Sequence, residues 1–147
     1  MDEPCPFCEI NLGRAPATFV HEWSDTIAIV PLNPVVDGHT LVIPKQHVRD
    51  FASDPVVAGA TMQRAAQLMR WTDRPMNLIT SRGREATQSV FHLHLHLVPR
   101  AEDDGLALPW HSGRSRPKTQ IHVQPDPPHV AEAIRDIRRF GPPPRHS

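Results

Sequence analysis

The sequence predicts an α+β fold with a mainly antiparallel five-stranded sheet, one long helix and a C-terminal helix. Two observations lead to this prediction. Short apolar runs bounded by turn residues recur along the chain, and one long helical pattern lies between them. With 147 residues, the chain is long enough for one domain with a hydrophobic core.

Three strands are predicted before the long helix. Residues 17–23 and 26–32 are apolar runs, and Ser24 and Asp25 between them are typical of a turn. A third run, residues 38–44, ends at a proline. We expect these three runs to form one side of the sheet.

The long helix is predicted to follow residue 53 and to run for about 16 residues. Ser53 or Asp54 can cap its start, and Pro55 suits a first-turn position. Small and apolar side chains then recur at helical spacing, at Ala58, Met62, Ala65 and Met69.

Two further strands and a proline-rich segment follow this helix. The strands are predicted at residues 76–80 and 89–99, with a polar loop between them. Proline accounts for 17 of 147 residues, and nine of the 17 lie in the last third of the chain. A second helix is predicted at 126–141, because it has capping residues, an apolar stripe and a terminating glycine. We therefore divide the chain into a domain, 1–110, and a proline-rich C-terminal extension with a short helix, 111–147.

Composition points to a cytoplasmic protein without a membrane or nucleic-acid partner. The formal net charge is zero, although residues 1–110 carry −4 and residues 111–147 carry +4. A solvated end explains the basic extension more simply than a polyanion site does. No apolar run approaches the roughly 20 residues that span a bilayer. The acidic N-terminus also lacks the basic and apolar regions of a secretory signal.

The two cysteines, Cys5 and Cys8, lie within the motif CPFC. A disulfide that closes so short a loop would constrain little of the chain. A reduced pair that binds a metal suits the compartment better. Redox use is the alternative, but a thioredoxin-type pair should follow a strand and open a helix within a βαβ pattern. Structural zinc is therefore favoured.

Three histidines, His92, His94 and His96, alternate with apolar residues in the run FHLHLHLV. Alternate side chains of a strand lie on opposite faces, which predicts a row of imidazoles about 6.6–6.8 Å apart. Phe91 and the alternate leucines would then pack the core. Three ionisable rings on one face bring no packing benefit, so we expect them to bind a metal or to carry out chemistry.

A zinc site is predicted from Cys5, Cys8, His47 and one of the three alternating histidines. Two thiolates and two imidazoles form a closed tetrahedral site of the structural type. If zinc takes a histidine at the end of the row, the other two stay free of metal. A catalytic metal bound by the row itself is the alternative.

A metal-free imidazole of the row can attack phosphorus near neutral pH, because its pKa is about 6.5. Such a nucleophile needs a partner that fixes its tautomer and donors for the charge on the phosphoryl oxygens. Gln88 and Ser89 supply an amide and a hydroxyl, and His39 and His96 supply ring N–H groups. No acidic pair suited to Mg²⁺ stands near them in the sequence, which favours a metal-independent covalent mechanism.

Three segments together resemble the histidine triad (HIT) family. HLHLHLV preceded by QS resembles the triad itself, and GHTLVIPKQHV resembles the second family signature. CPFCEI resembles the opening of zinc-containing bacterial members. The order and spacing of the segments agree over residues 4 to about 110, and the resemblance implies the HIT-like fold.

The resemblance implies a nucleotide hydrolase or nucleotidyl transferase. In the family, the middle histidine attacks the α-phosphorus of a nucleoside phosphoramidate or dinucleotide-type substrate, and a nucleotidyl-histidine intermediate forms. By position the nucleophile is His94, and the other catalytic residues are His96, His39 and Ser89. The residues implied in substrate binding are Gln88, Ser89, His96 and Asn33.

The resemblance also implies a cofactor, a substrate class and a partner. Its zinc ligands would be Cys5, Cys8, His47 and His92. The substrate would be a purine nucleotide or nucleotide conjugate, and the protein would form a homodimer through the long helix and an adjoining strand. A non-catalytic nucleotide-binding module on the same scaffold is the alternative.

The sequence departs from the family pattern at three positions. Pro31 stands where relatives carry an aspartate that binds the ribose, and Ser81 stands where many have asparagine. Thr87 stands where many have glycine, which permits backbone angles that a β-branched residue resists. These departures concern ribose recognition and leave the residues of the phosphate chemistry in place.

Overall fold

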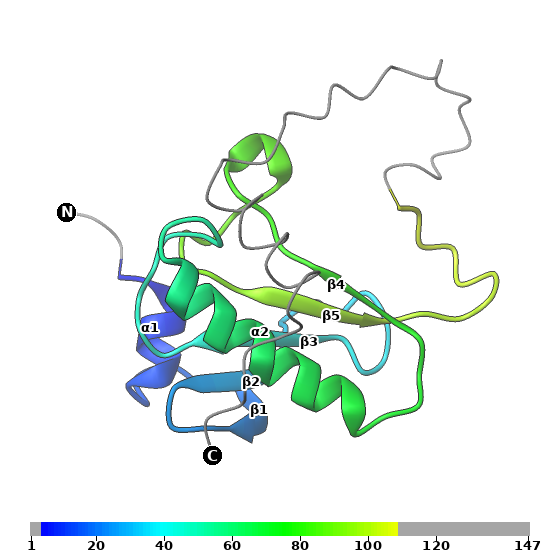
Figure 1. The fold of residues 1–147 in the computed structure, drawn as a ribbon, viewed down its shortest axis with the longest axis horizontal. Helices are drawn as coiled ribbons and strands as arrows, with labels where there is room; N and C mark the ends of the chain where they lie inside the picture. Colours follow the sequence, from blue (N-terminus) through cyan, green and yellow to red (C-terminus); the bar gives the residue numbers. More distant parts are fainter. Residues whose placement is uncertain (1–3, 109–147) are drawn as a thin grey trace, which may run out of the picture. The chain divides into compact units, whose positions relative to one another are not determined.

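A computed structural model describes residues 4–108 of the chain, and the predicted C-terminal helix lies outside them. A five-stranded antiparallel sheet with strand order β1-β2-β3-β5-β4 forms its centre (Figure 1). The predicted α+β class and five-stranded sheet are thus confirmed. The elements are α1 (Pro6–Asn11), β1 (Thr18–Glu22), β2 (Thr26–Val30), β3 (Thr40–Pro44), α2 (Pro55–Arg70), β4 (Met76–Ile79), the 3₁₀ helix η1 (Arg84–Ala86) and β5 (Leu95–Pro99).

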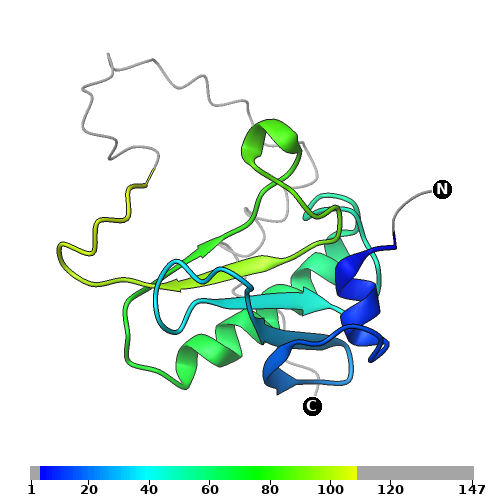
Figure 2. The same ribbon diagram turned by 180° about the vertical axis from the view of Figure 1, so that it is seen from behind.

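Helix α2 covers one face of the sheet and begins as the sequence predicts. Asp54 caps it, because its side chain accepts hydrogen bonds from the amides of Val56 and Val57 at 3.0 and 3.2 Å. The helix packs on β3 and β5. In the view from the back of the molecule, the sheet lies in front of α2 (Figure 2). None of the helices in residues 4–108 has the length and apolar composition needed to cross a bilayer.

Two separate apolar clusters line the two faces of the sheet, as strand alternation requires. The cluster under α2 contains Val42, Val48, Ala58, Ala65, Leu93, Leu95 and Leu97. The cluster on the other face contains Phe7, Ile27, Ile29, Leu41 and Ile43. Helix α1 contributes Phe7 to this second cluster, so a helix covers part of each face.

The fifth strand is shorter than the predicted 89–99, because regular pairing begins only at Leu95. Before it, the amide of Leu93 donates to the carbonyl of Val48 at 2.7 Å, outside the ladder that β5 makes with β3. Leu93 still packs in the core under α2, together with Leu95 and Leu97. The expectation that Phe91 joins this core is wrong: its ring lies under the guanidinium of Arg49 at 4.3 Å.

Helix α1 was not predicted from the sequence. It is only six residues long, too short for a visible apolar period, and Pro6 lies in its first turn. The CPFC motif therefore opens a helix, but within residues 4–108 no strand precedes it, unlike a thioredoxin-type pair.

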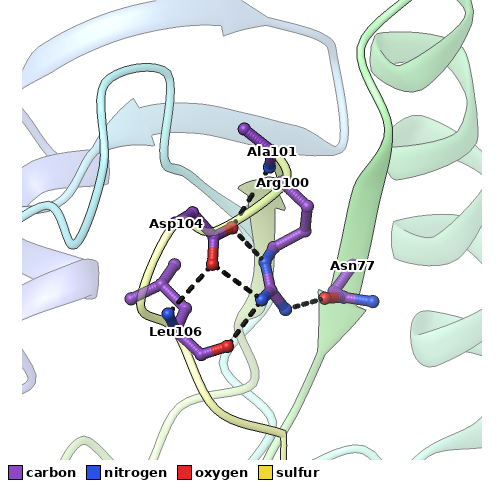
Figure 3. A network of polar contacts seen from close by, with 5 residues as sticks. All are labelled: Asn77, Arg100, Ala101, Asp104 and Leu106. Carbon is purple, nitrogen blue, oxygen red and sulfur yellow. Dashed lines mark hydrogen bonds and ion pairs between the residues drawn. The ribbon is translucent and has the colours of Figure 1, made fainter.

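The segment after β5 is tied to a single carboxylate (Figure 3). Asp104 accepts hydrogen bonds from the guanidinium of Arg100 at 2.7 and 3.0 Å, and from the amides of Ala101 and Leu106. Arg100 also donates to Asn77 of β4 at 2.7 Å. These bonds hold the pKa of Asp104 well below its ordinary value, with the Arg100 bonds as the largest cause.

We expect Asp104→Asn to lower the midpoint of thermal unfolding at pH 7. Because the pKa of Asp104 is lower in the folded state, its stabilising contribution is complete above the ordinary value of 3.8. It is lost as the pH falls below that value, so the difference between variant and wild type should shrink at pH 3. Asp103→Asn is the matched control, because Asp103 is exposed. A difference that stays constant from pH 7 to pH 3 contradicts the prediction.

Thr87 adopts a left-handed backbone conformation, with φ 70° and ψ 19°. Glycine adopts such angles readily, whereas a β-branched residue resists them. This region costs a residue with a Cβ roughly 1–2 kcal/mol.

We therefore predict that Thr87→Gly raises the free energy of unfolding by about 1 kcal/mol. Denaturant titration should show a higher midpoint with an unchanged slope. Thr87→Ala, which keeps a Cβ, is the control and should gain less. A lower midpoint for Thr87→Gly would sink this account of the turn.

Candidate functional site

Three imidazoles meet on the sheet face opposite α2. His39 lies just before β3, His94 lies just before β5, and His96 lies within β5. The ring centroids of His94 and His96 are 5.1 Å apart, and those of His39 and His96 are 5.2 Å apart. The predicted spacing of 6.6–6.8 Å along the row is wrong for this pair, because His94 precedes the regular strand.

The tautomer of His94 is fixed by the backbone. Its Nδ1 lies 2.7 Å from the carbonyl oxygen of His92, which can only accept a hydrogen bond. Nδ1 therefore carries the proton, and in the neutral ring Nε2 keeps a free lone pair. The partner that fixes the tautomer of this ring is thus a backbone carbonyl.

The tautomers of His39 and His96 are fixed by donors to Nδ1, the opposite of the arrangement at His94. The amide of Val35 donates to Nδ1 of His39 at 3.1 Å, so the proton of the neutral His39 ring is on Nε2. That nitrogen lies 2.9 Å from Nδ1 of His96 and donates to it. The neutral His96 ring then carries its own proton on Nε2, which makes this nitrogen a hydrogen-bond donor.

Burial keeps these three rings neutral at physiological pH. It lowers the pKa of His39 and of His94 below the ordinary value of 6.5. For His96, burial and then the neighbouring His94 and His39 lower the pKa to about 4. A neutral ring with a free nitrogen is the form that can act as a nucleophile.

A second cluster next to the three rings has the composition of a metal site. Cys5, Cys8, His47 and His92 each offer one ligand atom, and these atoms all lie within 4.8 Å of one another. Nε2 of His92 donates to the carbonyl of Pro44 at 2.8 Å, which leaves Nδ1 free for a metal. That Nδ1 lies 3.3 Å from Sγ of Cys5, 3.6 Å from Sγ of Cys8 and 3.0 Å from Nδ1 of His47.

The donor set fits zinc. In a tetrahedral site with the usual Zn–N and Zn–S bond lengths, ligand atoms are separated by about 3.3–3.8 Å, close to the distances found here. Burial, followed by the neighbouring Cys5, raises the pKa of the Cys8 thiol to about 11. Near neutral pH, Cys8 can therefore be a thiolate beside Cys5 only when a cation is bound by both. His94 and His96 do not belong to this cluster of ligand atoms.

The other predicted substrate residues lie in two loops. Ser89 and Asn33 are both exposed. Gln88 is 4% exposed and its amide donates to the carbonyls of Arg49 and Val90, at 2.8 and 3.1 Å. Its oxygen accepts from the amide of Gly83 at 2.9 Å. In this conformation the side chain of Gln88 has no free donor for a substrate. It connects its own loop to Arg49, in the segment between β3 and α2.

Several groups that orient the site were not found from the sequence. Three are backbone atoms: the amide of Val35 and the carbonyls of Pro44 and His92. No residue-type pattern can reveal them, because every residue carries these groups. Phe7 was also missed, although its place between the two cysteines was visible.

The chain matches the family model described as the HIT domain over residues 13–103. An uncharacterised HIT-like protein of Mycobacterium tuberculosis is 38% identical over 112 residues, which cover 71% of this chain and 77% of that protein. The adenosine 5'-monophosphoramidase of Saccharomyces cerevisiae is 30% identical over 118 residues, covering 75% and 72%. The adenylylsulfatase of Arabidopsis thaliana is 31% identical over 112 residues, covering 72% and 57%.

Solved structures agree with these matches. A Zn-bound histidine triad family protein from Mycobacterium smegmatis is similar with a TM-score of 0.62 at 37% identity, covering 71% of this chain and 80% of that one. A HIT family hydrolase from Clostridium thermocellum has a TM-score of 0.62 at 31% identity, covering 70% and 96%. With this fold, this domain match and the three converging imidazoles, the chain belongs to the histidine triad (HIT) family.

Proposed function

We propose that the protein is a nucleotide hydrolase or nucleotidyl transferase that acts through a covalent nucleotide adduct on His94. One observation carries this proposal: the hydrogen bond from Nδ1 of His94 to the carbonyl of His92 leaves Nε2 unprotonated on a neutral ring. Two relatives whose names state an activity, an adenosine 5'-monophosphoramidase and an adenylylsulfatase, support a nucleotide substrate.

In the first step, Nε2 of His94 attacks the α-phosphorus and forms a P–N bond. The bond from phosphorus to the leaving group breaks, and the leaving group takes the electron pair and a proton from water. The Nε2–H of His96, oriented by His39, donates to the charge that develops on the phosphoryl or leaving-group oxygens. The exposed hydroxyl of Ser89 is the second donor in this proposal.

In the second step, water or another acceptor attacks the same phosphorus. The P–N bond breaks, the electron pair returns to Nε2 of His94, and the proton of the attacking group passes to solvent. The neutral nucleophile is thereby regenerated. The substrate is a purine nucleoside phosphoramidate or a dinucleotide-type compound, with Asn33 beside it.

We predict that His94→Ala lowers kcat/KM by at least about 10⁴-fold, since residues that form the covalent bond have effects of this size. The measurement is cleavage of AMP-lysine-type phosphoramidates and dinucleoside polyphosphates, with mass detection of a nucleotide adduct on His94. His21→Ala is the control, because His21 contacts Trp23 and Trp71 instead of the triad. If AMP binds but every substrate stays intact in the wild type, the protein is a binding module.

The four-residue cluster holds structural zinc in this proposal. Its ligands would be Cys5, Cys8, His47 and His92. The ion would then cross-link α1, the segment after β3 and the segment that carries His92. No open position for a substrate remains when all four ligands bind.

Metal analysis of the purified protein should give one zinc per chain. Cys8→Ser should lose the metal and lower the thermal midpoint, because zinc binding contributes directly to folding. His94→Ala should keep it. Loss of zinc from His94→Ala would favour a metal bound by the histidine row and would contradict this assignment.

A cytoplasmic homodimer completes the proposal. Strand β4 is an edge of the sheet, and Ile79 on it and Met62 on α2 are 41% and 37% exposed. Ile79 is the cross-strand partner of His96, so it lies on the sheet face opposite α2. The exposed strand edge and the exposed helix side chain are each suited to contact with a second copy.

A further inference from the structure

Phe7 lies between the two cysteines of the metal cluster and contacts the proposed nucleophile. Its side chain is 8% exposed. Its ring centroid is 5.8 Å from that of His92 at an interplanar angle of 86°, and 5.2 Å from that of His94 at 66°. Both are edge-to-face contacts, which depend on orientation as well as on distance.

Helix α1 has few means of holding Phe7 in place by itself. Six residues are too few for a stable isolated helix. Cys5 stands at its N-cap and makes no capping hydrogen bond through its side chain. The helix is attached through Phe7 and Ile10 in the apolar cluster and through the two thiols at the metal cluster. Binding of Cys5 and Cys8 to one ion would therefore fix the position of the intervening Phe7.

His92 makes a second connection between the metal cluster and the nucleophile. Its ring is oriented by the carbonyl of Pro44 so that Nδ1 faces the thiols, while its own carbonyl accepts the Nδ1 proton of His94. A change in the position of His92 thus acts on His94 directly through the backbone.

The sheet leaves the ring of His94 free to be positioned by these contacts. His94 precedes β5, so no ladder pairing holds its backbone. Its carbonyl accepts from the hydroxyl of Thr80 at 3.0 Å, which anchors the main chain and leaves the side-chain torsions open. The ring itself is held by the His92 carbonyl and by edge-to-face contacts with the rings of Phe7 and His96.

We propose that the metal cluster positions the nucleophile: Phe7 and the His92 carbonyl together hold the His94 ring in its reactive orientation, and Phe7 is a positioning residue. The catalytic meaning of this inference rests on the proposed function, whereas the orientation of the ring does not. Zinc in this account stabilises the fold and also determines the geometry of a ring that it does not touch.

The test uses the full chain loaded with zinc and the variant Phe7→Leu, which keeps an apolar side chain but removes the ring. Phe19→Leu is the matched control, because Phe19 lies on β1 and is 46% exposed. We expect Phe7→Leu to keep one zinc per chain and to lower kcat by between about tenfold and a hundredfold, as small misplacements of reacting groups do. KM should stay within about twofold, because the leucine leaves the substrate contacts in place.

The second readout is the ¹⁵N spectrum of the His94 ring, which reports its tautomer without any substrate. In the wild type it should show one tautomer with the proton on Nδ1. Both Phe7→Leu and wild type stripped of zinc should show broadened or mixed signals, and adding zinc back to the wild type should restore the single tautomer. Phe19→Leu should match the wild type.

The outcomes separate the two proposals. If wild type forms no adduct on His94, the proposed function fails, and the ring spectra still test the positioning. Unchanged His94 signals and unchanged kcat in Phe7→Leu overturn the inference. If Phe7→Leu loses zinc, the stripped wild type decides: unchanged His94 signals overturn the inference, and mixed signals that zinc restores support it.

Discussion

The hydrogen bond from Nδ1 of His94 to the carbonyl oxygen of His92 decides which nitrogen of the central ring is free. A carbonyl accepts and never donates, so the proton stays on Nδ1 while the ring is neutral. Burial keeps the ring neutral by lowering its pKa. With the proton on Nε2 instead, the lone pair would be on Nδ1, where it would face the carbonyl of His92 and not a substrate.

Hydrogen-bond donors and acceptors also determine where the protons of the two neighbouring rings lie. Val35 donates to His39, and His39 donates to His96. Each of these two rings therefore accepts a hydrogen bond on Nδ1 and carries its proton on Nε2 while it stays neutral. A buried charged histidine would carry a large desolvation cost, whereas neutral rings that share hydrogen bonds do not. Three imidazoles can therefore share one small site.

His92 belongs to two arrangements at once. Its ring faces the thiols of Cys5 and Cys8, and its carbonyl faces His94. The two clusters stay chemically distinct, because the ligand atoms come together without His94. They remain mechanically connected, because one residue takes part in both.

Several features could be predicted from the sequence because they depend on residue type and spacing. The α+β class, the start of α2 at Pro55 and the burial of Leu95 and Leu97 follow from apolar periodicity and capping residues. The set Cys5, Cys8, His47 and His92 could be proposed because thiols and imidazoles are the ligands zinc prefers, and the structure brings them together. Other features depend on distances that only the folded chain defines. The start of β5 at Leu95, the occupied amide of Gln88 and the contact of Phe7 with His94 arise from segments far apart in the sequence. Residue identity thus determined which groups are available for chemistry, whereas tertiary structure decided which nitrogen of each ring is free, because the deciding partners are backbone atoms that every residue shares.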